Sequence, residues 1–389
     1  MIRERIVPRA DWKEKAQEVG FTYYNDGDFV GSNWDESICY RFTLEEVLKL
    51  EEATAELHSM CIKAIQNFIW DNPYDPVVAI SKEFNLPMAW AKLAYNSFVN
   101  HKDITIMGRF DLAYNDKTGD IKLLEYNADT PTMVIETALV QWFWLQDVHP
   151  DLDQFNSLHE KLIDRYKHLK KFIGNRTVTF SSISPNDSSE EYNHVLYFMD
   201  LASQAGINTK FCEMKDIGLD SEGYFVDQDN ETIEYWSKLY PWEWLLEEEF
   251  GRNLLDDRLN VIEPPWKMLL SNKSLLPLLW KHYPNHKYLL PASYNKEDVG
   301  ENYVKKPIFA REGANISYIN GENSHFTSGP YDENLSIYQG MADLGVHDDQ
   351  YSIICSWVAG GDPAGMIIRE SDTPIITTGS KIVPHYIKD

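Results

Sequence analysis

Residues 124–132 read LEYNADTPT, and this stretch ends the second strand of a predicted β-hairpin. The segments 104–114 and 121–127 are rich in apolar and aromatic residues, which is typical of strands. Between them, residues 115–120 read NDKTGD, a polar run with a glycine that favours a turn. An antiparallel pair at this position is the first piece of sheet that the sequence predicts.

Three side chains of this hairpin carry oxygen atoms that bind metal ions well. Glu125 and Asn127 are two residues apart, so they point to the same face of their strand. Pairing within the hairpin can bring Asp111 of the first strand beside them. Such a group suits Mg²⁺ that is held together with phosphates. An acidic hairpin with a solvated face and an Asx turn explains the same residues without a metal.

Patterns on both sides of the hairpin predict helices. Thr43 and Glu46 form a capping-box pattern in front of apolar residues at helical spacing. After the hairpin, apolar stripes predict helices at about 133–147 and 154–172.

The middle of the chain changes to alternating strands and helices. A strand, a helix and a strand follow one another between 176 and 214, which predicts a small doubly wound sheet. Asp187 and Glu190 are the expected cap of its helix, and Pro264-Pro265 marks a boundary. Beyond it we expect a helix near 273–281 and strands at 287–293, 302–309, 336–340 and 351–359. The fold class is therefore mixed α/β, with expected parts at 1–172, 173–263 and 264–389.

Two basic segments of the last third suit anionic ligands. The segment 302–316 predicts a strand and a glycine-containing loop, whose N–H groups can lie over phosphates. Lys305 and Lys306 point to opposite faces of the strand. An ordinary hairpin with a glycine turn fits this segment equally. Arg369 ends an apolar strand and can hold a phosphate or carboxylate, although a single arginine more often forms a surface salt bridge.

Composition narrows the class of protein. The chain has 389 residues, a net charge of −25 and 43% hydrophobic residues, so it can fill more than one core. Its acidity argues against nucleic acid as a partner; it favours a cationic substrate or serves solubility alone. The four cysteines fit neither a zinc pattern nor a disulfide framework. No leader or membrane-length apolar run is seen, so we expect a cytoplasmic protein without membrane contact. The sequence carries no indication of oligomeric state.

Four motifs together resemble one family. LLEYNADTPT, KKP-x₃-REGANI, GMIIRES and the closing VPHYI are similar to motifs of the glutathionylspermidine synthase family, over about residue 20 to the C-terminus. The resemblance is closest to short bacterial members that consist of the synthetase domain. It implies a permuted ATP-grasp architecture with a small pre-ATP-grasp-like subdomain, because the acidic motif precedes the lysines.

The resemblance also implies roles for individual residues. Those that match are the magnesium ligands Asp111, Glu125 and Asn127, the ATP-binding Lys273, Lys306, Gly313, Ala314 and Gln339, and the catalytic Arg109 and Arg369 beside the transferred phosphate. Thr130 and Thr132 stand where the family has glutathione-contacting serines. They keep the hydroxyl groups and add methyl groups.

The implied activity is that of an ATP-dependent carboxylate–amine ligase that forms an amide through an acylphosphate, with ATP and two Mg²⁺ ions. A glutathione-like or other peptide acid and a polyamine-like amine are the candidate substrates. The sequence identifies no general base. Acidic residues such as Glu243 and Glu247 to Glu249 favour a cationic amine, or else only solvate a helix. The alternative function is a nucleotide-binding regulatory or peptide-binding module without turnover.

Overall fold

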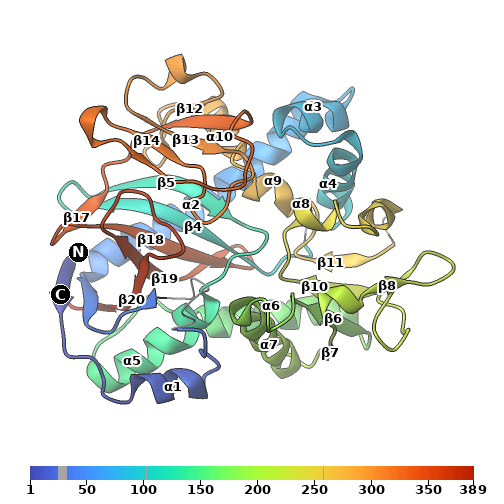
Figure 1. Cartoon of the computed structure of the whole chain (residues 1–389), viewed down its shortest axis with the longest axis horizontal. Helices are drawn as coiled ribbons and strands as arrows, with labels where there is room; N and C mark the ends of the chain where they lie inside the picture. Colours follow the sequence, from blue (N-terminus) through green and yellow to red (C-terminus); the bar gives the residue numbers. More distant parts are fainter. Residues whose placement is uncertain (25–32, 102, 257) are drawn as a thin grey trace.

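The computed structural model describes residues 1–24, 33–101, 103–256 and 258–389. It confirms a mixed α/β fold, built around a seven-stranded sheet (Figure 1). Its strands lie in the order β2 (Asn33–Trp34), β20 (Lys381–Val383), β19 (Asp362–Ser371), β18 (Gln350–Ala359), β4 (Met107–Asn115) and β5 (Asp120–Asn127), with β17 (Gly345–His347) paired to β18.

β4 and β5 form the predicted hairpin at one edge of this sheet. Asp111 faces Glu125 across the antiparallel pair, and Arg109 faces Asn127. Residues directly opposite one another share a face of the sheet. The four polar side chains therefore lie on one face, and the predicted placement of Asp111 beside Glu125 and Asn127 is confirmed.

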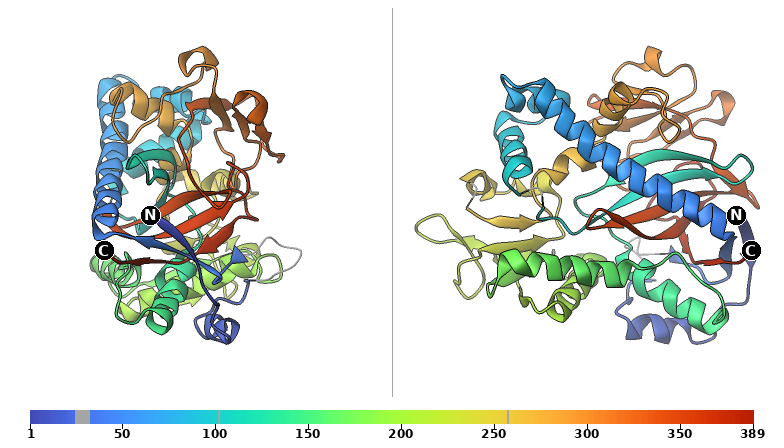
Figure 2. Two further views of the ribbon diagram at one scale, coloured as in Figure 1. Left: turned by 90° about the vertical axis from the view of Figure 1, so that its left-hand side faces the viewer. Right: turned by 180° about the vertical axis from the view of Figure 1, so that it is seen from behind.

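One long helix, α2 (Leu44–Asp71), crosses the sheet on its other face (Figure 2). Its start is the predicted capping box: the Glu46 N–H donates to the Thr43 hydroxyl, and the Thr43 N–H donates to the Glu46 carboxylate. The apolar stripe of α2 packs in one core with Leu112 of β4 and Ile354 of β18.

The polar face of the sheet is covered over part of its area by helices that follow the hairpin. The helix predicted at about 133–147 is confirmed in extent, since helical residues run from 134 to 148. It differs in containing the π-helix η1 (Glu136–Val140), which α5 (Gln141–Val148) continues. The helix predicted at about 154–172 is α6 (Leu158–Ile173), which begins four residues later than predicted. Alternate residues of β18 pack into two different cores, one on each face, so the centre of the sheet is buried on both sides.

The middle of the chain forms a parallel sheet with the order β11 (Asn260–Ile262), β10 (Tyr235–Lys238), β6 (Thr177–Ser181) and β7 (Asn208–Phe211). α7 (Ser189–Gln204) joins β6 to β7, as the strand–helix–strand pattern predicts. The predicted cap was wrong by one residue: Ser188, not Asp187, accepts the Glu191 N–H, since its side chain is the one in reach. The strand order reverses between β6 and β10, the kind of position where doubly wound sheets bind ligands.

A third, antiparallel sheet has the order β12 (Ala292–Ser293), β16 (Ser336–Gly340), β13 (Tyr303–Pro307), β14 (Ser317–Ile319) and β15 (His325–Phe326). The strand expected at 287–293 is reduced to β12. The residues before β12 lie along β5 instead, where the Tyr288 carbonyl accepts the Leu123 N–H at 2.8 Å. α9 (Lys267–Ser271) and α10 (Leu275–His282) precede this sheet.

Among the helices that the sequence patterns missed are α3 (Pro76–Glu83) and α4 (Met88–His101). Asp75 caps α3 by accepting the Val78 N–H, and Pro76 occupies the first turn, a recognisable start signal. The other elements are α1 (Trp12–Glu18), α8 (Trp242–Leu245), the sheet of β1 (Ile2–Arg5), β3 (Ile38–Phe42) and β21 (His385–Ile387), the pair β8 (Gly218–Leu219) and β9 (Phe225–Val226), and the 3₁₀ turns η2 (Met214–Asp216), η3 (Gly251–Asp256), η4 (Lys296–Asp298) and η5 (Gly321–Asn323).

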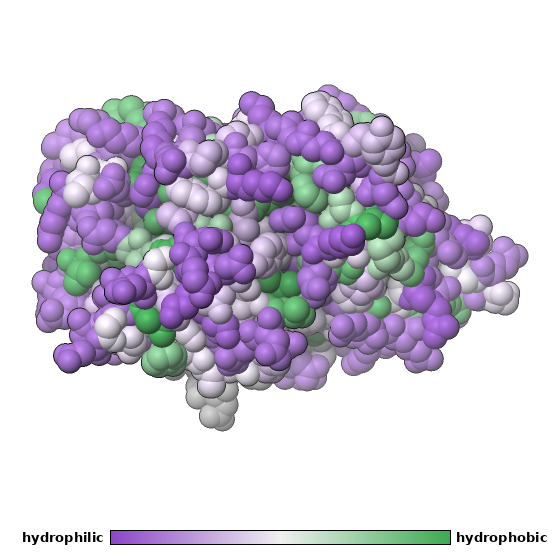
Figure 3. Space-filling model, turned by 90° about the horizontal axis from the view of Figure 1, so that it is seen from above, coloured by the Kyte–Doolittle hydropathy of each residue, from purple (hydrophilic) through white to green (hydrophobic). Residues whose placement is uncertain are grey.

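Hydrophilic side chains cover most of the face seen in Figure 3, with smaller hydrophobic patches between them. This agrees with the excess of 61 acidic over 36 basic residues. Among the helices in the described ranges, none is both long and apolar enough to cross a membrane.

The capping box of α2 gives a stability prediction. Thr43→Ala removes the oxygen that accepts the Glu46 N–H and should lower the free energy of unfolding by about 1 kcal/mol. Lys49→Met is the control: it breaks only an exposed ion pair with Glu45, which should cost about 0.5 kcal/mol or less. Chemical denaturation measures both, and equal losses would show that the cap is unimportant.

Candidate active site

One large cavity lies where the seven-stranded sheet, the antiparallel β13–β16 sheet and the parallel sheet meet. Nearly all of the site residues proposed from the sequence line it: Arg109, Asp111, Glu125, Asn127, Thr130, Thr132, Lys273, Lys306, Gly313, Gln339 and Arg369. Ala314 follows Gly313 in the same loop. The residues come from segments more than 250 positions apart in the chain, so only the fold brings them together.

The hairpin carries alternating charges on its cavity face. The Arg109 guanidinium donates to both carboxylate oxygens of Asp111, from Nε at 2.8 Å and from a terminal nitrogen at 3.2 Å. Lys273 lies 3.1 Å from one oxygen of Glu125, and the Asn127 amide donates to the other at 3.2 Å. Burial alone would raise the pKa of Glu125, but Lys273 and Lys306 overcome this and hold the pKa well below its usual value. Glu125 is therefore ionised at neutral pH.

This group fits Mg²⁺ by its chemistry. Asp111, Glu125 and Asn127 offer only oxygen atoms to a cation, which is the donor type that Mg²⁺ prefers, and the ionised Glu125 carries a full charge. In the described part of the chain, no three His, Cys, Asp or Glu side chains converge enough to hold a metal without other ligands. A magnesium ion here needs waters or phosphate oxygens as further ligands, which is its usual state.

Lys306 is buried and holds the edge of β5. Its ammonium donates to the Leu124 carbonyl at 2.9 Å and to the Gln339 amide oxygen at 2.7 Å, while the Gln339 NH₂ donates to the Leu123 carbonyl at 2.9 Å. Burial, only partly opposed by Glu125, lowers the pKa of Lys306 to about 8. Lys305 points the other way, toward Glu333 at 3.8 Å. The predicted opposite facing of the two lysines is confirmed.

A loop and a strap close the cavity from two sides. Gly313 has φ +71, and a Cβ atom there would lie 2.4 Å from the Ile376 carbonyl oxygen, so only glycine fits without movement. The strap consists of residues 374–378. Its Thr377 carbonyl accepts a hydrogen bond from the Arg369 guanidinium. Arg369 Nε is buried and has no hydrogen-bond partner among the described residues. This donor is therefore uncommitted in a residue that lines the cavity.

Arg311 belongs to the site although the sequence patterns did not single it out. Its guanidinium donates to Glu243 Oε1 at 2.6 and 3.1 Å and to the Thr130 hydroxyl at 2.9 Å. Glu243 is thus committed to an arginine, so it is not a free carboxylate for a cationic amine. Arg311 is the first residue of the REGANI motif, so the motif could have identified it as a site residue.

Glu190 and Glu191 form an acidic end of the cavity that sequence reasoning also missed. Both are half-buried in the first turn of α7, at the switch point beside β6. Burial raises the pKa of Glu190 to about 7, against the favourable charge of His194. Glu191 Oε2 is buried without a hydrogen-bond partner in the described structure. Glu312 lines the same end.

Comparisons with known proteins agree with this arrangement. A family model described as "Glutathionylspermidine synthase preATP-grasp" matches residues 3–388. A protein of Haemophilus influenzae named "Putative acid--amine ligase" is 37% identical over 394 residues, with 97% of each chain covered. The "Bifunctional glutathionylspermidine synthetase/amidase" of Escherichia coli is 28% identical over 384 residues, which cover 90% of this chain and 60% of that protein. This chain therefore matches only part of the bifunctional relative.

A solved structure shows a related fold. A glutathione synthetase-like effector of Globodera pallida, in the apo form, has a TM-score of 0.54 at 10% sequence identity. The match covers 98% of this chain and 100% of that one.

Gly108 gives a prediction for the hairpin. A Cβ atom there would lie 2.6 Å from the ring of Tyr126, which is stacked on Phe110 with the ring centroids 3.9 Å apart. Gly108→Ala should therefore cost about 1–3 kcal/mol of folding free energy by overpacking. In the control, Gly218→Ala, the new atom lies 3.8 Å from Val226 and should be nearly neutral. Denaturant unfolding compares the two, and an unaffected Gly108→Ala would mean that the ring yields freely.

Proposed function

This chain belongs to the glutathionylspermidine synthase family, and we propose that it is an enzyme that uses ATP to join a carboxylic acid to an amine through an acylphosphate. The supporting observation is the convergence of the hairpin's oxygen ligands with Lys273 and Lys306 in one cavity. We further propose that the fold is a permuted ATP-grasp, in which the acidic hairpin precedes the lysines in the chain.

The reaction has two steps that balance without another reactant. A carboxylate oxygen of the acid bonds to the γ-phosphorus of ATP while the bond from that phosphorus to the β,γ-bridging oxygen breaks, and ADP leaves. The amine nitrogen then attacks the acyl carbon, the carbon–oxygen bond to the phosphate breaks, and phosphate leaves. One proton of the amine passes to a base.

The residues of the chain divide these tasks by charge. Lys273 and Lys306 hold the phosphates of the nucleotide, and the N–H groups around Gly313 and Ala314 lie over them. Gln339 fixes Lys306 by its 2.7 Å hydrogen bond. Arg109, Arg311 and Arg369 offer cationic donors to the transferred phosphate. Asp111, Glu125 and Asn127 would hold magnesium, which when bound neutralises phosphate charge.

The acidic end of the cavity sets the class of amine. Glu190, Glu191 and Glu312 are not ion-paired in the described structure, and all three line the cavity. A cationic amine, such as a polyamine, matches their charge and would restore partners to buried oxygens such as Glu191 Oε2. We assign Glu190 as the proton acceptor, because its pKa of about 7 suits a general base near neutral pH.

The acid lies on the side of Thr130 and Thr132. Their two side chains line the cavity near Arg109, whose terminal nitrogen donates to the Thr132 carbonyl at 3.0 Å. Relatives are named for glutathionylspermidine, so a glutathione-like peptide acid is the first candidate. The added methyl groups favour a somewhat smaller acid at this point.

A substrate screen tests the function. Wild-type protein with ATP, Mg²⁺, a panel of peptide acids and either spermidine or a neutral amine of similar size should release ADP and form an amide with the cationic amine. Asn127→Ala should lose turnover on the order of 10²–10³-fold while keeping its circular dichroism spectrum. Mass spectrometry identifies the product. ATP binding without ADP release across the panel would favour a nucleotide-binding module instead, and equal use of both amines would reject the cationic class.

The two lysines of β13 give a second test. Lys306→Met should weaken ATP binding, whereas the matched Lys305→Met should scarcely change it, because only Lys306 faces the cavity. Lys306 has a depressed pKa, so its charge is present below and lost above about pH 8. Wild-type affinity for ATP should therefore fall as the pH rises through 8, and Lys306→Arg should remove that fall. Calorimetric titration measures all four proteins; a stronger effect of Lys305→Met would reverse the assignment.

A further inference from the structure

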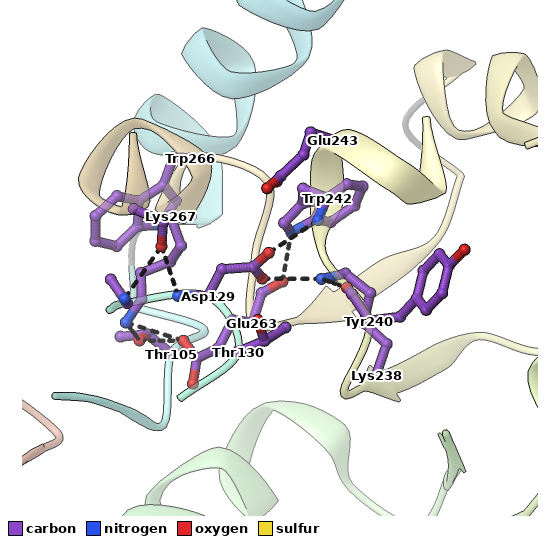
Figure 4. Close-up of polar contacts among 12 residues, drawn as sticks. Thr105, Asp129, Thr130, Lys238, Tyr240, Trp242, Glu243, Glu263, Trp266 and Lys267 are labelled. Atoms are coloured by element: carbon purple, nitrogen blue, oxygen red, sulfur yellow. Dashed lines mark hydrogen bonds and ion pairs between the residues drawn. The ribbon is translucent and has the colours of Figure 1, made fainter. Parts of the chain in front are cut away.

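Asp129 forms a buried ion pair that the reaction described above does not use. Lys238 at the end of β10 donates to Asp129 Oδ1 at 2.9 Å, and both side chains are fully buried (Figure 4). The ammonium also donates to the Tyr240 carbonyl at 2.8 Å and lies 4.6 Å from the Trp242 ring centroid. The pair joins the loop after β5 to the parallel sheet.

The same carboxylate completes a closed ring of contacts. Asp129 Oδ2 accepts the Trp242 N–H at 2.9 Å, and Glu243 follows Trp242 in the chain. Glu243 accepts from Arg311, and Arg311 donates to Thr130, which follows Asp129. Figure 4 shows Thr130 and Glu243 beside this carboxylate. Every link of the ring is a peptide connection or a hydrogen bond of 2.6–2.9 Å.

The ring leaves Arg311 little freedom. Its guanidinium contacts two residues, Glu243 and Thr130. Glu243 follows Trp242, whose N–H Asp129 accepts, and Thr130 follows Asp129 itself. A shift of Asp129 moves both anchors together. A fully buried ion pair adds little net stability compared with apolar residues of the same size. Its contribution to stability therefore does not explain its presence, whereas the positions that it gives to Thr130 and Trp242 do.

We propose that Asp129 and Lys238 are positioning residues, whose ion pair fixes this ring and so aims the Arg311 guanidinium into the cavity. The effect on turnover rests on the proposed ligase function, whereas the orientation of Arg311 does not. Lys238 anchors the ring from the parallel sheet, and Asp129 carries the constraint to the hairpin loop.

A neighbouring pair offers a matched control. Lys267 lies 3.2 Å from Glu263, and these side chains are only 3% and 5% exposed. Lys267 also donates to the Met107 carbonyl at 2.7 Å. It has the same chemistry as Lys238 and a comparable burial. Among the described residues, no hydrogen bond links Lys267 or the Glu263 carboxylate to Thr130, Glu243 or Arg311, and Trp242 contacts this pair only at the Glu263 main-chain carbonyl, at 3.0 Å. Figure 4 shows both pairs in one view.

The test compares Lys238→Met with Lys267→Met in the full chain. Both should lower the melting temperature, because each leaves a carboxylate buried without its cation. Only Lys238→Met should speed hydrogen exchange in the loop 309–315, and only it should lower kcat, by about 10- to 100-fold as expected for a misplaced group. The KM for ATP should stay near the wild-type value in both.

Further variants keep the outcome decisive. If Lys238→Met does not fold, Asp129→Asn keeps the shape of the side chain and should show the same exchange and kcat pattern. In an Arg311→Met background, Lys238→Met should cause no additional loss of kcat, because it acts through Arg311.

Equal exchange and equal kcat in the Lys238 and Lys267 variants would overturn the proposal, and so would additive losses with Arg311→Met. A wild-type protein without ligase turnover would contradict the proposed function instead. The hydrogen-exchange comparison needs no substrate and would still decide whether the pair orients the loop.

Discussion

The part of the cavity that lysines and arginines line is governed by the requirement that buried charge must be paired. Lysines and arginines lie there beside carboxylates, in surroundings where an unpaired ion is costly. Arg109 therefore pairs with Asp111, Lys273 with Glu125, and Arg311 with Glu243. The pairs of Lys273 and Arg311 join segments that are far apart in the chain at the wall of the cavity. The same groups that suit a phosphate ligand thus hold the walls of the site in place.

Local sequence patterns predicted much of the fold. The hairpin, the capped helix α2 and the strand–helix–strand unit depend on alternation, spacing and caps that lie within a few residues of one another. Glu125 and Asn127 could be placed on one face for that reason. The start of α3 at Asp75-Pro76 was equally local and was overlooked. The π-helix η1 has no simple spacing signal, and the short β12 reflects competition with β5, which is a long-range contact.

The site was predictable only where a motif marked it. Lys306 and Arg369 stood out in basic segments, but Lys273 came from the family resemblance alone, since no local pattern distinguishes it from another buried lysine. Glu190 and Glu191 lie in the first turn of a helix, where acidic residues are common. The reversal of strand order between β6 and β10 marks them, and that order exists only in the folded protein. The ion pair of Glu243 with Arg311 likewise could not be predicted locally, because the two residues are 68 positions apart in the chain.

The switch point also bears on how such a protein diverges. Glu190 and Glu191 of the acidic end stand where α7 begins, just beyond β6, whereas the proposed metal ligands and Lys306 lie within strands. Segments that connect strands accept substitutions and insertions more readily than the strands they join. Under the proposed function, the residues for amine preference and those for nucleotide chemistry occupy separate segments of the chain. A lineage could then acquire a new acceptor by changing the connections around the parallel sheet while its phosphate chemistry stays intact.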